Sequence, residues 1–361
     1  MENRKALIAM SGGVDSSVAA LLMKEKGYDC VGCTMKLYRN EDAGIENEHT
    51  CCSLDDVEDA KRIARYLEIP YYIFNFSQDF RANIIDRFVW SYENGRTPNP
   101  CIDCNRYIKF GKLFERAQIL GCDKVVTGHY ARIEKQGGQY ILKKAVDAKK
   151  DQSYVLYTMT QKQLSQTMFP LGELEKTTVR KLAQEHGFTN AEKPDSQDIC
   201  FVPDGDYARV VELYAKHPVC PGNFVDLSGA VLGQHRGIIH YTIGQRKGLG
   251  ISFSKPHYVC AIDPASNTIT LGKNADVHQR HLTADDFNWI SGSAPCRPIR
   301  CKAKIRYGQA EQPATATALS DGTVKVLFDA PQRAITPGQA VVLYDGDIVL
   351  GGGVISPHGN T

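Results

Sequence analysis

Short apolar runs alternate with amphipathic stretches through the first part of the chain. The apolar runs are expected to be strands and cover residues 6–10, 30–35, 71–76 and 124–127. The amphipathic stretches are expected to be helices and cover residues 18–26, 54–67, about 79–93, 107–120 and about 178–186. This alternation predicts an α/β fold in which helices cover both faces of a parallel sheet. Ligands of such sheets bind beyond the carboxyl ends of the strands.

The pattern changes after about residue 203, where glycine and proline begin to separate short apolar runs. Strand-like segments follow at residues 258–262, 268–271, 301–307, 324–328 and 340–344. This punctuation is typical of mostly β structure and predicts a small central domain followed by a β-barrel. We therefore expect three domains, with boundaries at 1–203, 204–280 and 281–361.

The segment SGGVDSS, at residues 11–17, lies between the first expected strand and the first expected helix. Adjacent glycines let the backbone fold closely around an anion, and a helix N-terminus offers it free N–H groups. Asp15 and the serines are expected to cap the helix. The spacing is neither that of a Walker P-loop nor GxGxxG. SGGxDS in this context resembles the ATP pyrophosphatase family, which implies splitting of ATP to AMP and pyrophosphate; the alternative is an ordinary Gly-Gly turn.

Composition indicates the compartment of the protein but does not identify what it binds. The 361 residues carry a formal net charge of +2, so any basic surface that binds nucleic acid must be local. No apolar run approaches twenty residues and the chain enters a strand without a secretory segment, which favours a cytoplasmic enzyme with no membrane span. Twelve cysteines in a reducing compartment indicate thiol chemistry, metal binding or core packing more often than disulfides.

Cysteines stand in two polar segments that are far apart in the sequence. TPNPCIDCN, at residues 97–105, contains Cys101 and Cys104 in a loop that opens a helix, a position that lowers a thiol pKa. DSQDICF, at residues 195–201, contains Cys200 after the end of a helix. Cys51 and Cys52 are adjacent, which is poor geometry for one metal ion, so a surface loop near the nucleotide is expected.

Six motifs occur in an order that resembles the family of tRNA-specific 2-thiouridylases. They are SGGVDSS, TPNPCxxCN, TGHYAR at 127–132, KDQSY at 150–154, DSQDICF and GQRKGLG at 244–250. The resemblance implies ATP-dependent 2-thiolation of the wobble uridine of tRNAs for Lys, Glu and Gln, with Mg²⁺. It implies that Cys104 is the nucleophile and Cys200 the persulfide carrier, and that the two can form a disulfide. A sulfur-relay protein or a cysteine desulfurase would deliver the sulfur.

The resemblance also implies two sets of binding residues. The nucleotide would be bound by Ala9, Met10, Ser11, Gly12, Gly13, Val14, Asp15, Ser16, Met35 and Gly128. The tRNA would be bound by Asn99, Pro100, Cys101, His129, Lys150, Asp151, Gln152, Arg306, Tyr307 and Gln339. For His129 a core or capping role is the alternative, and for Tyr307 simple packing is the alternative to stacking on a base.

Cys101 departs from the family pattern, in which many members carry Asp. A general base at this position is therefore in doubt. Cys101, Cys104 and Cys200 could together hold a [4Fe–4S] cluster with one iron open to sulfide. The alternative is that Cys101 has no part in the chemistry.

A basic run lies in the region of the expected barrel. If residues 300–306 form a strand, Arg300, Lys302, Lys304 and Arg306 share one face, and such an uncompensated row favours contact with tRNA phosphates. Residues 245–248 form a second basic turn. Two other functions stay open: a ligase of the same superfamily that acts on a small-molecule carbonyl, and an RNA-binding iron–sulfur or redox module without turnover.

Overall fold

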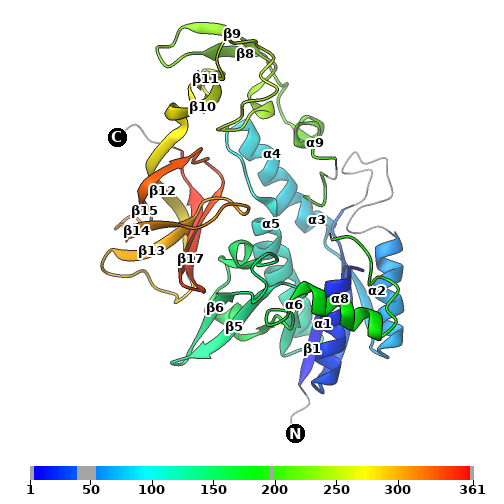
Figure 1. Cartoon of the computed structure of the whole chain (residues 1–361). Coiled ribbons are helices and arrows are strands. Elements are labelled where there is room, and N and C mark those ends of the chain that lie inside the picture. Colours follow the sequence, from blue (N-terminus) through cyan, green and yellow to red (C-terminus); the bar gives the residue numbers. More distant parts are fainter. Residues whose placement is uncertain (1–3, 39–53, 196–198, 203, 358–361) are drawn as a thin grey trace.

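The structure, a computed structural model, describes residues 4–38, 54–195, 199–202 and 204–357. Its first part contains a parallel five-stranded sheet in the order β3-β2-β1-β4-β7 (Figure 1). The strands are β1 (Lys5–Ala9), β2 (Asp29–Lys36), β3 (Tyr71–Asn75), β4 (Lys124–Val126) and β7 (Thr167–Met168). The first four coincide with the strands expected from the apolar runs, whereas the two-residue β7 is too short to leave a pattern.

Helices pack on both faces of this sheet, as predicted. One face is covered by α1 (Val14–Glu25), α2 (Leu54–Tyr66) and α8 (Lys176–Glu185). The other is covered by α3 (Ser77–Phe80), α4 (Asp86–Glu93) and α6 (Leu113–Ile119). Strand β1 contributes alternate residues to the two cores, since Leu7 and Ala9 face one and Ala6 and Ile8 the other. The α/β class is therefore confirmed.

Two helices contain π-helical segments that the hydrophobic pattern did not predict. The π-helix η2 (Arg81–Ile85) joins α3 to α4, and η3 (Cys104–Lys112) joins α5 (Pro100–Asp103) to α6. The second helix thus begins at Pro100, seven residues before the expected start. Asn99 caps it by accepting a hydrogen bond from Cys101 N, and Pro100 occupies the first helical position, which suits its missing N–H. Single-turn π segments are frequent at functional sites.

The central part contains a four-stranded sheet in the order β10-β11-β8-β9. Its strands are β8 (Gly222–Val225), β9 (Val231–His235), β10 (Tyr258–Asp263) and β11 (Thr268–Gly272), and helix α9 (Tyr207–Tyr214) precedes them. Helix α4 extends from the parallel sheet towards this sheet and packs against α9 and η5 (Ile238–His240) (Figure 1).

The last part is a closed six-stranded barrel, as predicted. Strands β12 (His278–Trp289), β15 (Val324–Arg333), β14 (Gln312–Ala318), β13 (Ile299–Lys304), β16 (Ala340–Asp345) and β17 (Ile348–Ile355) pair in that order, and β12 pairs with β17 to close it. Closure removes the exposed edges that an open sheet presents. The glycines in the middle of β17 let it approach β12 closely, since a Cβ on Gly351 would be 2.4 Å from Asn288 O.

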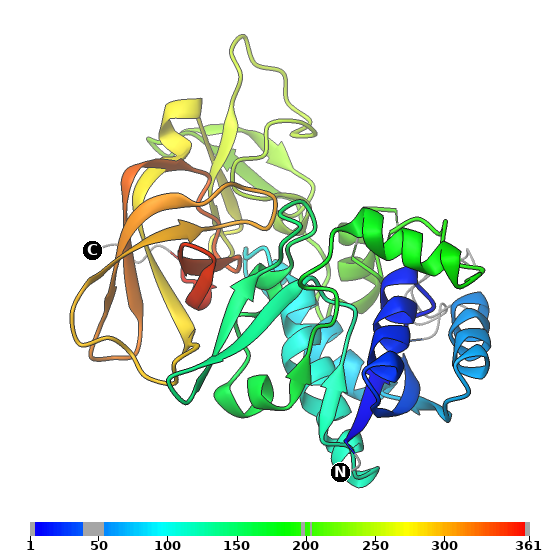
Figure 2. The same cartoon turned by 60° about the horizontal axis from the view of Figure 1, so that its bottom comes forward.

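An unpredicted hairpin connects the first domain with the barrel. Strands β5 (Ala131–Gln136) and β6 (Gln139–Lys144) extend the barrel sheet through the pairing of Lys143 with Ile348. Figure 2 shows this hairpin between the barrel and the parallel sheet. The remaining short helices are η4 (Ser153–Leu156), α7 (Gln161–Ser165) and η6 (Asn274–Val277). In the part of the chain that the structure describes, no helix has the length and apolar character needed to span a bilayer.

Candidate active site

The SGGVDSS turn connects β1 to α1 at the carboxyl end of the parallel sheet. Gly12 has a φ of +77°, and a Cβ there would lie 2.3 Å from Asp56 O, so only glycine fits between the turn and α2. Within the described residues Gly13 caps α1 without a side-chain hydrogen bond. The hydroxyls of Ser16 and Ser17 instead donate to Gly13 O at 2.9 and 3.2 Å. The expected capping by Asp15 and the serines is therefore wrong.

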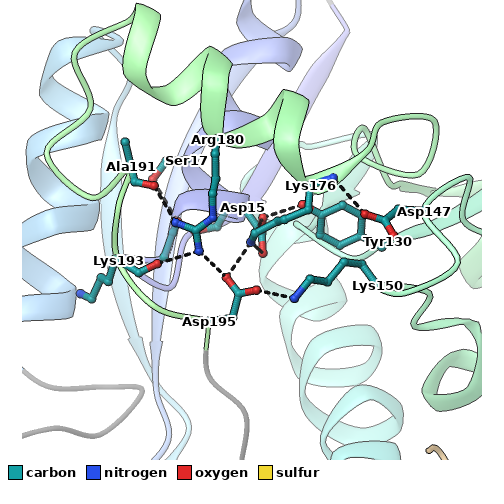
Figure 3. A network of polar contacts seen from close by, with 12 residues as sticks. Asp15, Ser17, Tyr130, Asp147, Lys150, Lys176, Arg180, Ala191, Lys193 and Asp195 are labelled. Atoms are coloured by element: carbon teal, nitrogen blue, oxygen red, sulfur yellow. Dashed lines mark hydrogen bonds and ion pairs between the residues drawn. The ribbon is translucent and has the colours of Figure 1, made fainter.

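Asp15 points from the first turn of α1 towards a buried lysine. Its carboxylate accepts hydrogen bonds from Lys176 Nζ at 2.7 and 2.8 Å and from Tyr130 OH at 2.7 Å (Figure 3). Lys176 is only 8% exposed. Burial and the nearby Asp15 carboxylate raise the pKa of Tyr130, so its hydroxyl remains a donor. Asp15 thus organises charge around the turn instead of capping the helix.

Asp195 is the second carboxylate that Lys176 contacts, at 2.8 Å. It also accepts from Lys150 Nζ at 2.7 Å and from Arg180 Nη2 at 3.1 Å, so three cations surround it (Figure 3). Burial alone would raise the pKa of Asp195, but the hydrogen bonds from Lys150 and Lys176 lower it to about 2. The carboxylate is therefore ionised at neutral pH.

The other expected nucleotide residues lie at the same end of the sheet. A Cβ on Gly128 would be 2.9 Å from Asp15 C and Ser16 N, so glycine lets the end of β4 approach the first turn of α1. Met10 N donates to Cys33 O at 2.7 Å, which places the turn beside the end of β2 and its half-buried Met35. Ala9 is buried within β1. The structure thus brings Ala9 to Ser16, Met35 and Gly128 to one edge.

The cysteine segments lie against the core on the sheet face that α3, α4 and α6 cover. Cys104 is the first residue of η3, and Cys104 and Cys200 are both half-buried against the hydrophobic cluster that contains Phe80 and Phe201. Tyr38 OH donates to Cys200 O, and Cys101 is exposed. Among the described residues no group of three or more His, Cys, Asp or Glu side chains is arranged to hold a metal ion. The three thiols therefore do not form a ligand set in this arrangement. Cys51 and Cys52 lie outside the described residues.

The barrel holds the segment that leads into Cys101. Gln339 Nε2 donates to Thr97 O at 2.8 Å and Pro98 O at 3.3 Å, and Thr97 N donates to Pro337 O at 2.9 Å. Arg306 Nη2 donates to Thr336 Oγ1 at 2.6 Å, and also to the backbone oxygens of Ile243 and Ala334. Burial lowers the pKa of Arg306. Arg306 and Gln339, two of the residues predicted to bind tRNA, thus hold segments of the protein itself in place.

The remaining residues expected at the tRNA surface differ in exposure. His129 is buried, with Nδ1 2.7 Å from Thr127 Oγ1 and its ring against Phe110 and Phe169, and burial lowers its pKa well below the usual value. This is the core role weighed as the alternative. Tyr307 is 44% exposed and its hydroxyl donates to Asp151 O at 3.1 Å.

The loop before η4 is held by its own polar side chains. The Asp151 carboxylate accepts hydrogen bonds from Ala145 N, Ser153 N and Ser153 Oγ. Gln152 N donates to Tyr130 O, and Gln152 Oε1 accepts from Tyr130 N at 3.0 Å. The tRNA contacts of Asp151 and Gln152 stay predictions.

The basic row that begins on β13 is compensated in part, contrary to expectation. The alternation holds, because Cys301, Ala303 and Ile305 are buried. However, both terminal nitrogens of Arg300 pair with Asp329, at 2.8 and 2.9 Å. Lys304 lies over the rings of Tyr154 and Tyr307, and burial lowers its pKa. Lys302 is exposed and has no ion pair within the described residues. Partners of Arg300 and Lys304 come from β15 and the first domain. A run of basic residues within one strand does not reveal partners from elsewhere in the chain.

Five residues of the site, as described here, were not predicted from the sequence: Lys176, Arg180, Tyr130, Asn190 and Asp195. Asn190 is buried, and its Nδ2 donates to Gly12 O at 2.8 Å and to Ser17 Oγ at 2.9 Å. The one available signal was chemical, since a carboxylate inside an anion-binding turn requires a nearby cation. Nothing in the spacing identifies which lysine supplies it.

Comparison with known proteins covers nearly the whole chain. Residues 4–204 match the family model described as tRNA methyl transferase HUP domain, 212–273 its PRC-barrel domain and 279–355 an aminomethyltransferase beta-barrel domain. A curated tRNA-specific 2-thiouridylase MnmA of Clostridioides difficile is 53% identical, with 98% of each chain covered. A second, from Caldanaerobacter subterraneus subsp. tengcongensis, is 52% identical at the same coverage. A solved 4-thiouridine synthetase–RNA complex with bound ATP aligns over 58% of this chain and 51% of its own, at 16% identity and a TM-score of 0.36. On the full-length match to the curated relatives, the chain belongs to the family of tRNA-specific 2-thiouridylases.

Proposed function

We propose that this protein replaces the C2 oxygen of the wobble uridine of tRNA with sulfur, using ATP and releasing AMP and pyrophosphate. One observation carries the proposal: the SGGVDSS turn starts helix α1 without a side-chain cap, holds the Asp15–Lys176 pair, and occurs in a chain that matches curated 2-thiouridylases over 98% of its length. The tRNAs proposed as substrates are those for Lys, Glu and Gln.

The first half-reaction activates an oxygen that is otherwise a poor leaving group. The C2 oxygen of uridine attacks the α-phosphorus of ATP, a uridine adenylate forms, and pyrophosphate leaves. The N–H groups at the start of α1 and the nearby lysines are suited to the charge that develops on the departing phosphates. Mg²⁺ would accompany the phosphates of ATP, as it does in other phosphoryl transfers.

The second half-reaction delivers sulfur through the two proposed cysteines. The Cys104 thiolate attacks Sγ of a Cys200 persulfide, the persulfide bond breaks, and its outer sulfur leaves as hydrosulfide. The hydrosulfide attacks C2, and AMP leaves with the former C2 oxygen. Cys104 and Cys200 finish as a disulfide, so a dithiol reductant must restore both thiols before the next turnover.

The proposed division of labour follows the domains. Residues 1–203 would carry the ATP chemistry and part of the tRNA surface, and residues 204–280 and 281–361 would provide the rest of the tRNA surface. The persulfide would come from a sulfur-relay protein or a cysteine desulfurase in the cytoplasm. A [4Fe–4S] cluster on Cys101, Cys104 and Cys200 remains the alternative sulfur carrier. It would require these thiols to gather differently, and iron analysis of protein purified without oxygen tests it.

The decisive experiment uses unmodified tRNA, ATP, Mg²⁺ and a persulfide source. After digestion of the tRNA, mass spectrometry should detect 2-thiouridine, and the product should disappear without ATP and in Cys200→Ser. A methylated nucleoside instead would favour the reaction named in the family-model descriptions. AMP formation that needs neither tRNA nor the cysteines would favour a small-molecule ligase, and no turnover would favour a binding module.

A further inference from the structure

Asp195 occupies a site that is built like an anion-binding site. Its two carboxylate oxygens accept hydrogen bonds from Lys150, Lys176 and Arg180, at 2.7, 2.8 and 3.1 Å. Two of these cations lie on α8 and the third precedes η4, so separate elements converge on one carboxylate. Because Lys176 also pairs with Asp15, three cations serve two carboxylates here. A phosphate group has the charge and oxygen geometry to replace Asp195 on these cations.

The same site adjoins the nucleotide turn. Lys176 Nζ bridges Asp195 to Asp15, so the Asp195 carboxylate is separated from the SGGVDSS turn by a single ammonium group (Figure 3). The turn and the three cations are therefore close enough to act on adjacent phosphates of one ligand. While Asp195 stays in place, it neutralises these cations and keeps a second anion away.

We propose that the Asp195 carboxylate holds the place of a nucleotide phosphate, and that the phosphates of ATP or pyrophosphate displace it from Lys150, Lys176 and Arg180. This inference rests on the proposed function, because it takes a nucleotide as the ligand of the SGGVDSS turn. Internal competition of this kind reduces apparent affinity by the fraction of molecules in which the site is open.

The test measures binding of pyrophosphate to the full-length chain by titration calorimetry, without tRNA. Asp195→Asn removes the competing charge, so pyrophosphate should bind at least about tenfold more tightly. Asp59→Asn is the matched control. It removes a carboxylate that pairs with Lys193, at 2.9 Å, and touches none of the three cations, so its affinity should equal that of the wild type. Equal or weaker binding by folded Asp195→Asn overturns the inference.

A second variant covers the case in which Asp195→Asn does not fold. Lys150 is the more exposed of the two lysines on Asp195, with 38% of its side chain accessible, so Lys150→Met should fold. It should bind pyrophosphate several-fold more weakly than the wild type, and unchanged binding would contradict a phosphate site on these cations. If the wild type binds neither pyrophosphate nor ATP, the proposed function itself fails. If the wild type binds both ligands and Asp195→Asn binds pyrophosphate no more tightly than the wild type, the proposed function stands and only the inference about Asp195 fails.

Discussion

Two charged clusters in this protein have similar composition and opposite character. The first joins Asp15, Lys176 and Asp195 at the start of α1, where Lys176 is almost fully buried. The second is the row on β13, where Arg300 and Asp329 form a pair with more than half of each side chain exposed. Water screens the second pair, whereas in the first it hardly reaches Lys176 and reaches the two carboxylates only in part. The buried cluster should therefore govern stability and chemistry, and the exposed one the salt dependence of binding.

The largest expected effect comes from the buried cluster. Asp15→Ala removes the carboxylate that fixes Lys176 beside the glycine turn, so the cation is no longer held where the leaving pyrophosphate needs it. We expect tRNA-dependent pyrophosphate release to fall by more than about 100-fold. Asp59→Asn removes a carboxylate that pairs with Lys193 and contacts neither Asp15 nor Lys176, so it should retain the rate. Release that survives in Asp15→Ala would refute the nucleotide assignment of the turn.

The next effect concerns stability and compares two lysines of one helix. Lys176→Met leaves Asp15 and Asp195 without their shared cation in a buried site, which should lower the free energy of unfolding by about 3 kcal/mol. Lys181 is 75% exposed, and among the described residues its one ion pair is with Glu185, so Lys181→Met should change little. Urea denaturation of both variants measures the difference. Similar values would mean that the Lys176 cluster is as well solvated as the exposed helix face.

The pH dependence sharpens the same contrast. Hydrogen bonds from Lys150 and Lys176 hold the pKa of Asp195 at about 2, below its usual 3.8. A carboxyl whose pKa is depressed by folding contributes stability above its unfolded pKa and loses it as the pH falls through its folded pKa. The stability difference between wild type and Asp195→Asn should therefore be full above about pH 4 and vanish near pH 2. A difference that is constant over this range in thermal melts would contradict the ionic role of Asp195.

The two clusters also explain what could be predicted from the sequence. Strand periodicity and the glycine turn depend on neighbours in the chain, so the sheet, the barrel and the SGGVDSS turn were predicted correctly. The partners of Asp15 come from residues 130 and 176, and that of Arg300 comes from residue 329. Such pairs depend on the topology, and the sequence contains no periodic signal for them. The same reason accounts for the buried His129 and for the β5–β6 hairpin.

The start of the helix that contains Cys101 was also not predicted from the sequence. The segment before Cys101 has two prolines and resembles a loop, yet Pro100 starts the helix because Asn99 caps it. Gln339, expected at the tRNA surface, donates to the backbone of this segment from the barrel. A residue that resembles a binding residue by motif can therefore serve first to position the site. Its tRNA contact stays a prediction.

The smallest expected effect separates two cations of the exposed row. Lys302 has no ion pair among the described residues, whereas Arg300 must first give up Asp329 to reach a phosphate. If the barrel binds the tRNA backbone through this face, Lys302→Ala should reduce the slope of log affinity against log salt by about 1, and Arg300→Ala by less. Filter binding of unmodified tRNA between about 50 and 200 mM salt measures both slopes. A larger effect of Arg300→Ala would show that tRNA breaks the Arg300–Asp329 pair, and unchanged slopes in both variants would move the tRNA contact to another face, such as the exposed turn at Arg246 and Lys247.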